Sequence, residues 1–100
     1  MGKLTTIYWR DIPAQVVGQQ GRKRHKKMLE SRFAVAIDRA AMRAGKGSSD
    51  AYLEEWRRES RASEGNIEEA VSAQVTRLEA MFPDELLETT VKAGGLLKKE

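Results

Sequence analysis

The residues best suited to chemistry lie in one basic run, Arg22-Lys23-Arg24-His25-Lys26-Lys27, which places five formal positive charges within six residues. Ammonium and guanidinium groups at this density favour phosphate- or carboxylate-bearing ligands. On a helix the run exceeds one turn and points in every direction, so we expect this end of the helix to protrude or to be loosely ordered. Cations at a helix N-terminus also oppose the helix dipole, which favours a functional reason for them. A solvated run that only aids solubility is the alternative.

Other chemically suggestive residues give no catalytic pattern. His25 has no serine or cysteine nucleophile placed beside it by the sequence. Residues 45–48 resemble the end of a phosphate-binding loop, but the upstream glycine is replaced by Ala40 and a strand does not precede them. The pairs Glu54-Glu55 and Glu68-Glu69 diverge by about 100° on a helix and cannot face each other. We predict no catalytic residue, and a non-catalytic role is favoured over an enzyme.

Composition excludes several further kinds of site. The chain has no cysteine and one histidine, so thiolate and histidine-rich metal sites are excluded, and we predict neither a metal nor a cofactor. Apolar runs are all much shorter than the roughly 18 residues of a membrane span, and no apolar signal segment begins the chain. We expect a cytoplasmic protein without membrane contact. One hundred residues support a single small domain, 1–100.

The elements that must position the basic run begin with a predicted β-hairpin over about residues 4–20. Alternation in Thr5 to Arg10 places Thr5, Ile7 and Trp9 on one face and Tyr8 and Arg10 on the other. Proline favours a reversal over residues 11–14, followed by a second strand from about residue 15. An isolated hairpin is marginal in water, so helices must cover it.

Most of the remaining chain has helical spacing. Helices are predicted over about residues 24–44, 50–59, 67–82 and 84–93, with residues 96–100 frayed. Phe33 and Ile37 belong to the buried stripe of the first helix, and Asn66 with Glu69 predicts a cap at the start of the third. Three flanking apolar residues at seven-residue spacing, Met28, Val35 and Met42, are expected to belong to the core. The predicted class is α+β, a two-stranded hairpin packed against a long helix and two to three further helices.

Three sequence blocks carry a family resemblance: Ile7-Tyr8-Trp9-Arg10-Asp11-Ile12-Pro13-Ala14-Gln15-Val16, Ala36-Ile37-Asp38-Arg39-Ala40-Ala41-Met42 and Asp50-Ala51-Tyr52-Leu53-Glu54-Glu55-Trp56. In this order they resemble the small bacterial virulence factor domain family, over roughly residues 4–80. The resemblance implies a bacterial protein and transfers no catalytic residue. It also implies association with iron-sulfur scaffold-like domains, and with folate-linked and corrinoid-linked methyl transfer.

The charge is unevenly distributed along the chain. Residues 1–48 carry eleven Lys/Arg and three Asp/Glu, a net +8, whereas residues 49–100 carry seven and twelve, a net −5. Such a dipolar surface can attract an acidic protein partner, a larger enzyme or a scaffold. We therefore expect a small interaction module; nucleic-acid binding and an enzyme acting on a small anionic substrate are the alternatives. Self-association by pairing of the hairpin edge is also possible. The predicted docking residues are Tyr8, Arg10, Arg22, Lys23, Arg24, Lys26 and Lys27.

Overall fold

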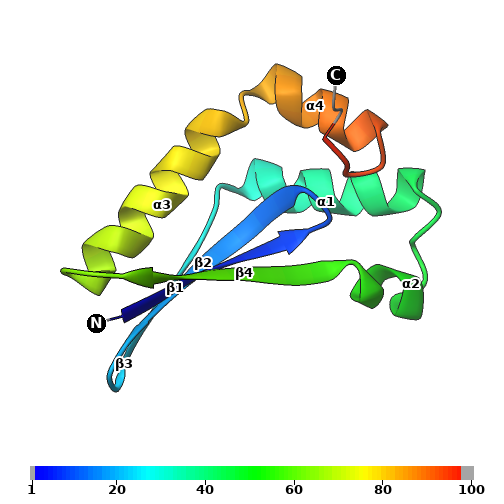
Figure 1. Cartoon of the computed structure of the whole chain (residues 1–100). Coiled ribbons are helices and arrows are strands. Elements are labelled where there is room, and N and C mark those ends of the chain that lie inside the picture. The colour runs from blue at the N-terminus through cyan, green and yellow to red at the C-terminus, as the bar shows by residue number, and fades with distance from the viewer. Residues whose placement is uncertain (1, 98–100) are drawn as a thin grey trace.

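A four-stranded antiparallel sheet forms one layer of the molecule, and helices form the other (Figure 1). The computed structural model describes residues 2–97, apart from the side chain of Ser49. The strands are β1 (Gly2–Trp9), β2 (Ile12–Gln20), β3 (Lys23–Met28) and β4 (Trp56–Ser63), in the order β3-β2-β1-β4. The helices are α1 (Ser31–Arg43), α2 (Ser49–Glu54), α3 (Ile67–Met81) and α4 (Asp84–Lys92). The α+β class is confirmed, but the predicted two-stranded hairpin is only the centre of a larger sheet.

The first hairpin turns more tightly than predicted. Trp9 pairs with Ile12, so only Arg10 and Asp11 form the turn, and Arg10 has a φ of 53°. Pro13 lies inside β2 opposite Tyr8, beside a register shift, rather than in the reversal. A proline is tolerated there because irregular pairing does not require its missing N–H, and β3 ends opposite Gln15, before it reaches Pro13.

The basic run is a strand, which corrects the predicted helix start near residue 24. Lys23 to Met28 pair antiparallel with Gln15 to Gln20 after a two-residue turn at Gly21 and Arg22. Gly21 has a φ of 59°, a conformation in which glycine carries no side-chain penalty. Backbone pairing with β2 therefore outweighs the helical spacing of the residues that follow, and α1 begins only at Ser31.

The fourth strand was missed by the sequence analysis. The predicted helix over residues 50–59 ends at Glu54, and Trp56 to Ser63 then pair along the whole of β1. Most side chains of β4 are exposed on both faces, so the strand shows no apolar alternation. Its place is set by backbone pairing to β1, from Gly2–Ser63 to Trp9–Trp56. Both edges of the predicted hairpin are consequently occupied, and the free edges of the sheet belong to β3 and β4.

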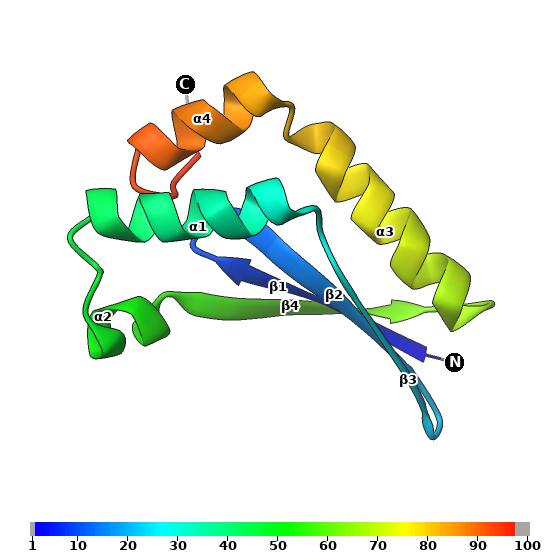
Figure 2. The same ribbon diagram turned by 180° about the vertical axis from the view of Figure 1, so that it is seen from behind.

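The core lies between the sheet and the helices. Figure 2 shows α1, α3 and α4 on the same side of the sheet, with α2 at one end. Phe33 and Ile37 are buried as predicted, and Asn66 caps α3 by accepting a hydrogen bond from the Glu69 N–H. The other expected core stripe is wrong: the exposed fractions are 57% for Met28, 56% for Val35 and 70% for Met42. Met28 belongs to β3, and the face of α1 that carries Val35 and Met42 points away from the sheet.

Helix α3 crosses the sheet at Gly18. A Cβ atom added there would lie 2.5 Å from Val71 Cγ2 and 2.6 Å from Ile67 Cγ1. Gly18 pairs regularly with Leu4 and His25, so its role is not a bulge but close contact with a helix. The absence of a side chain at Gly18 sets how near α3 lies to β2. Helix α3 covers this face of the sheet and not the opposite one.

Candidate functional site: a basic sheet face

One face of the sheet carries no helix over most of its described length, as Figures 1 and 2 both show. Directly paired residues point to the same face, so the register identifies its members. This open face consists of Lys3, Thr5 and Ile7 of β1, Gln15, Val17 and Gln19 of β2, Arg24, Lys26 and Met28 of β3, and Arg58, Ser60 and Ala62 of β4. Seven of these residues, including Lys3, Arg24 and Arg58, line a small hollow of about 180 Å³.

The open face is uniformly basic. Its twelve positions include four cations, Lys3, Arg24, Lys26 and Arg58, and no carboxylate. Within residues 2–97 none of the four forms an ion pair. Thr5 and Val17 beneath them are only 8% and 9% exposed, which fits long side chains whose apolar stems lie over the sheet while the charged heads reach water.

Polar groups between the cations add hydrogen-bonding capacity. The Thr5 and Ser60 hydroxyls are 2.8 Å apart and bond to each other across β1 and β4. Gln15 Oε1 is buried and has no hydrogen-bond partner among the described residues. The open face therefore combines positive charge with hydroxyl and amide groups.

The structure divides the predicted basic run between two faces and a turn. Arg22 lies in the β2–β3 turn, and Arg24 and Lys26 point to the open face. Lys23 and His25 point to the other side, where they line a small hollow with Asn66 and residues 67–68 at the start of α3. Lys27 shares that side by alternation, so the run is not a single patch.

Tyr8 and Arg10 are not brought together with the basic run. Arg10 lies in the turn before β2, and Arg22 in the turn after it, so the nine residues of β2 separate them by roughly 30 Å. The Arg10 side chain is only 16% exposed and is used internally. Its guanidinium donates to the Gly94 carbonyl at 3.0 Å and lies 3.3 Å from a Glu55 carboxylate oxygen.

Neighbouring residues complete this internal network around the first turn. The Arg57 guanidinium lies 4.3 Å from the Tyr8 ring centre and donates to the Arg10 carbonyl. Asp11 accepts a hydrogen bond from the Leu97 N–H at 2.7 Å, and its own N–H donates to the Gly95 carbonyl. Hydrogen bonding to Arg10 holds the pKa of Glu55 below its usual value. Tyr8 and Arg10 thus join the hairpin turn to β4 and to the segment after α4.

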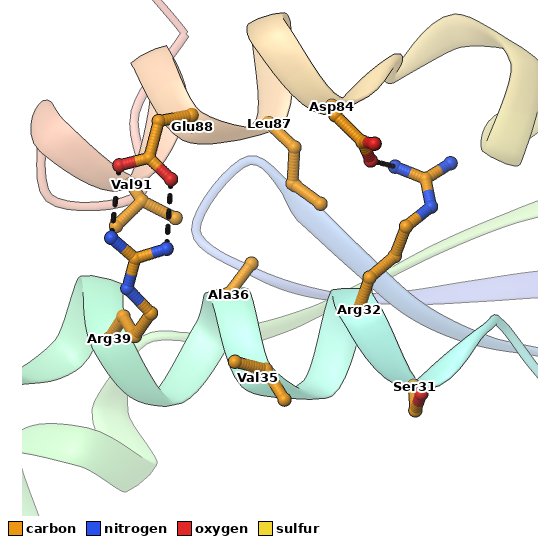
Figure 3. A pocket seen from close by; sticks show the side chains of 9 residues that line it. All are labelled: Ser31, Arg32, Val35, Ala36, Arg39, Asp84, Leu87, Glu88 and Val91. Carbon is orange, nitrogen blue, oxygen red and sulfur yellow. Dashed lines mark hydrogen bonds and ion pairs between the residues drawn. The ribbon is translucent and has the colours of Figure 1, made fainter.

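A second concavity lies between α1 and α4, with a volume of about 380 Å³ (Figure 3). Ala36, Leu87 and Val91 form its apolar floor, and charged residues span it on both sides. Arg39 donates two hydrogen bonds to Glu88, at 2.8 and 2.9 Å, which lowers the pKa of Glu88 and raises that of Arg39. A second ion pair, between Arg32 and Asp84 at 3.4 Å, also crosses the concavity, so the two pairs join α1 to α4.

Other classes of site find no support in the described part of the chain. Residues 2–97 contain no cluster of three potential metal-ligating side chains. Over the same residues, none of the helices combines the length and apolar character needed to cross a bilayer.

Two functional candidates on the open face, Lys3 and Arg58, were missed by sequence reasoning. Lys3 lies two residues before Thr5, so the alternation that groups Thr5 with Ile7 could have placed Lys3 on the same face. Arg58 could be found only by recognising β4, whose sequence lacks the apolar alternation of a half-buried strand.

Comparison with known proteins identifies the family. The model of the virulence factor family matches residues 7–91, which include all but the first five residues of β1 and nearly all of α4. The chain belongs to the virulence factor family. No curated protein and no solved structure matches it. The family match includes Tyr8, Arg10, Asp11, Glu55 and Arg57 of the internal network, but not its partners at residues 94–97, and it includes most of the open face.

Proposed function

We propose that this virulence factor family protein is a non-catalytic binding module, and that its open face takes an acidic protein partner. The observation that carries the proposal is the presence of four cations and no carboxylate across the twelve positions of that face. Positive charge that is not neutralised internally attracts an acidic surface and orients it during the encounter. The partner we favour is a larger bacterial enzyme or scaffold, in keeping with the methyl-transfer and iron-sulfur associations that the family resemblance implies.

Carboxylates are favoured over nucleic acid because the open face lacks an aromatic platform. Single-stranded nucleic acids stack their bases on exposed aromatic rings, and none of the twelve positions is aromatic. Trp9 and Trp56, which end β1 and begin β4, both pack on Tyr52, at ring-centre distances of 5.8 and 5.7 Å. A small anionic substrate is less well supported. The hollow of about 180 Å³ is smaller than the roughly 300–1,000 Å³ of typical ligand pockets, and its lining includes no carboxylate or histidine that could act as acid or base.

A charge-reversal pair tests the proposal. Arg58→Glu changes the open face, and Arg43→Glu makes the same change in net charge on the exposed part of α1. The probes are a fluorescent deca-glutamate peptide and a fluorescent ten-nucleotide single-stranded DNA, titrated at low and high salt. We expect Arg58→Glu to weaken peptide binding several-fold more than Arg43→Glu at low salt, with the difference shrinking as salt screens it.

Three results would contradict the proposal. Equal losses in the two variants would mean that only net charge matters. Unchanged binding in Arg58→Glu would remove the open face from consideration. Tighter binding of the oligonucleotide than of the peptide at matched charge and salt would favour the nucleic-acid alternative.

A further inference from the structure

The outer edge of β3 carries backbone groups that no strand within residues 2–97 pairs with, since β3 ends the sheet. The Leu29 N–H donates to the Ala14 carbonyl, which continues the β2–β3 register by one residue. In an antiparallel ladder, bonded and non-bonded pairs alternate. Lys23, His25 and Lys27 therefore bond to β2, and the N–H and C=O groups of Arg24, Lys26 and Met28 point outward.

The same residues that offer these backbone groups also carry charge to the open face. The side chains of Arg24 and Lys26 point there, two residues apart. No side chain of residues 22–27 is joined to another described residue by an ion pair. The other sheet edge differs, because Arg57 of β4 is paired with Asp11 and with Glu59. Of the two edges, β3 is the one whose charges are all available.

We propose that an extended acidic segment of the partner adds to β3 as a fifth, antiparallel strand. Residues of the segment that bond to Arg24 and Lys26 lie directly opposite them and point to the same face. A carboxylate at every second position would then face each cation in turn, while main-chain hydrogen bonds give affinity. The inference rests on the proposed function and specifies the conformation in which the acidic partner binds.

A second copy of the chain fits this edge poorly. Pairing β3 with β3 would place the cations of residues 22–27 against one another, and like charges directly opposite destabilise a ladder. Lysine-rich edge strands are a known means of preventing such self-pairing. The positive charge of β3 therefore disfavours pairing with a second β3 strand and favours pairing with an acidic strand.

Backbone methylation of a peptide tests the strand geometry without changing its charge. The parent probe is a blocked seven-residue peptide of alternating threonine and glutamate. One derivative is N-methylated at every glutamate and the other at every threonine. In the proposed geometry the main-chain N–H groups of the glutamates donate to the backbone carbonyls of Arg24 and Lys26, whereas those of the threonines point away. Methylation at glutamate should therefore weaken binding about ten-fold or more, and methylation at threonine should leave it nearly unchanged.

Variants of the protein test the same contact from the other side. Lys26→Ala removes one charge. Lys26→Pro removes the same charge and also the outward N–H, and it breaks no hydrogen bond to β2 because that N–H points away from β2. We expect Lys26→Pro to bind the parent peptide roughly three-fold or more weakly than Lys26→Ala, with circular dichroism establishing that both are folded. If Lys26→Pro fails to fold, the methylated peptides alone decide the matter.

The outcomes separate the two proposals. Equal binding of all three peptides, with loss in Arg58→Glu, would overturn strand addition and leave the proposed function standing. No binding of the parent peptide or of deca-glutamate would contradict both. Concentration-dependent dimers of the free protein that dissociate in Lys26→Pro would assign the edge to a second copy instead.

Discussion

Replacing Phe33 by alanine gives the most direct check on the packing that supports the sheet. The ring is 1% exposed, lies 6.0 Å from that of Phe82 in an edge-on arrangement, and has the Arg32 guanidinium 4.4 Å above it. Alanine would remove the contact between α1 and the end of α3 and leave a cavity. Such truncations cost about 3–5 kcal/mol. For a domain of this size, a loss of about 3 kcal/mol lowers the melting temperature by at least about 12 °C.

The assays are urea unfolding and thermal unfolding, both followed by circular dichroism, with Met42→Ala as the matched control. Met42 lies on the same helix but is 70% exposed, so its truncation should change the unfolding free energy by about 0.5 kcal/mol or less. Comparable unfolding midpoints for Phe33→Ala and the wild-type protein would refute the assignment of this face of α1 to the core. A loss in Met42→Ala as large as in Phe33→Ala would refute the exposure of the opposite face.

Three further predictions concern the sheet, the first turn and metals. Gly18→Ala should lower the urea midpoint, because the new Cβ meets Ile67 and α3 must move; an unchanged midpoint would contradict the close approach. Glu55 has a pKa below its ordinary value of 4.5 because Arg10 donates a hydrogen bond to it. Its contribution to the free energy of unfolding is therefore complete above pH 4.5, and is lost as the pH falls through the lower pKa of the folded state. Unfolding measured from pH 6 to pH 2 should accordingly show a shallower acid loss in Glu55→Gln than in the wild type, and parallel curves would exclude this contribution. Extensive chelation should leave the circular dichroism and the binding of deca-glutamate unchanged, whereas a stoichiometric metal that survives purification would contradict a metal-free role.

Sequence periodicity predicted the helices best where burial falls on one side of a helix. The α3 stripe that includes Val71 and Val75 is buried, and the cap at Asn66 forms as its spacing with Glu69 indicates. Both signals are local, since they arise from residues within a few turns of one another.

The strands at the sheet edges could not be found in the same way. β3 and β4 expose side chains on both faces, so they have neither the period of a half-buried strand nor an apolar run. Their positions depend on pairing with β2 and β1, and the β1–β4 pairs join residues that are 47 (Trp9 and Trp56) to 61 (Gly2 and Ser63) positions apart. The candidate site could be predicted only in part for the same reason. The basic run was recognised in the sequence, but Lys3 and Arg58 lie on the same face as part of it only because the strands pair.

The hydrogen bonds at Arg10 also constrain the order of events while the chain is being synthesised. Arg10 has a φ of 53°, a conformation that costs a residue with a side chain about 1–3 kcal/mol. Its partner at Gly94 is 84 positions further along the sequence. A nascent chain can bring β1 and β2 together early, but the contacts that hold their turn come later, first from Glu55 and Arg57 and last from residues 94–97.

β1 likewise lacks its second neighbour until Ser63 has been made. During that interval its open edge is available to any other extended chain, and a basic β3 on the far side does nothing to protect it. The period of greatest vulnerability to misassembly is therefore the translation of residues 21–63, before the finished sheet offers only its two charged edges.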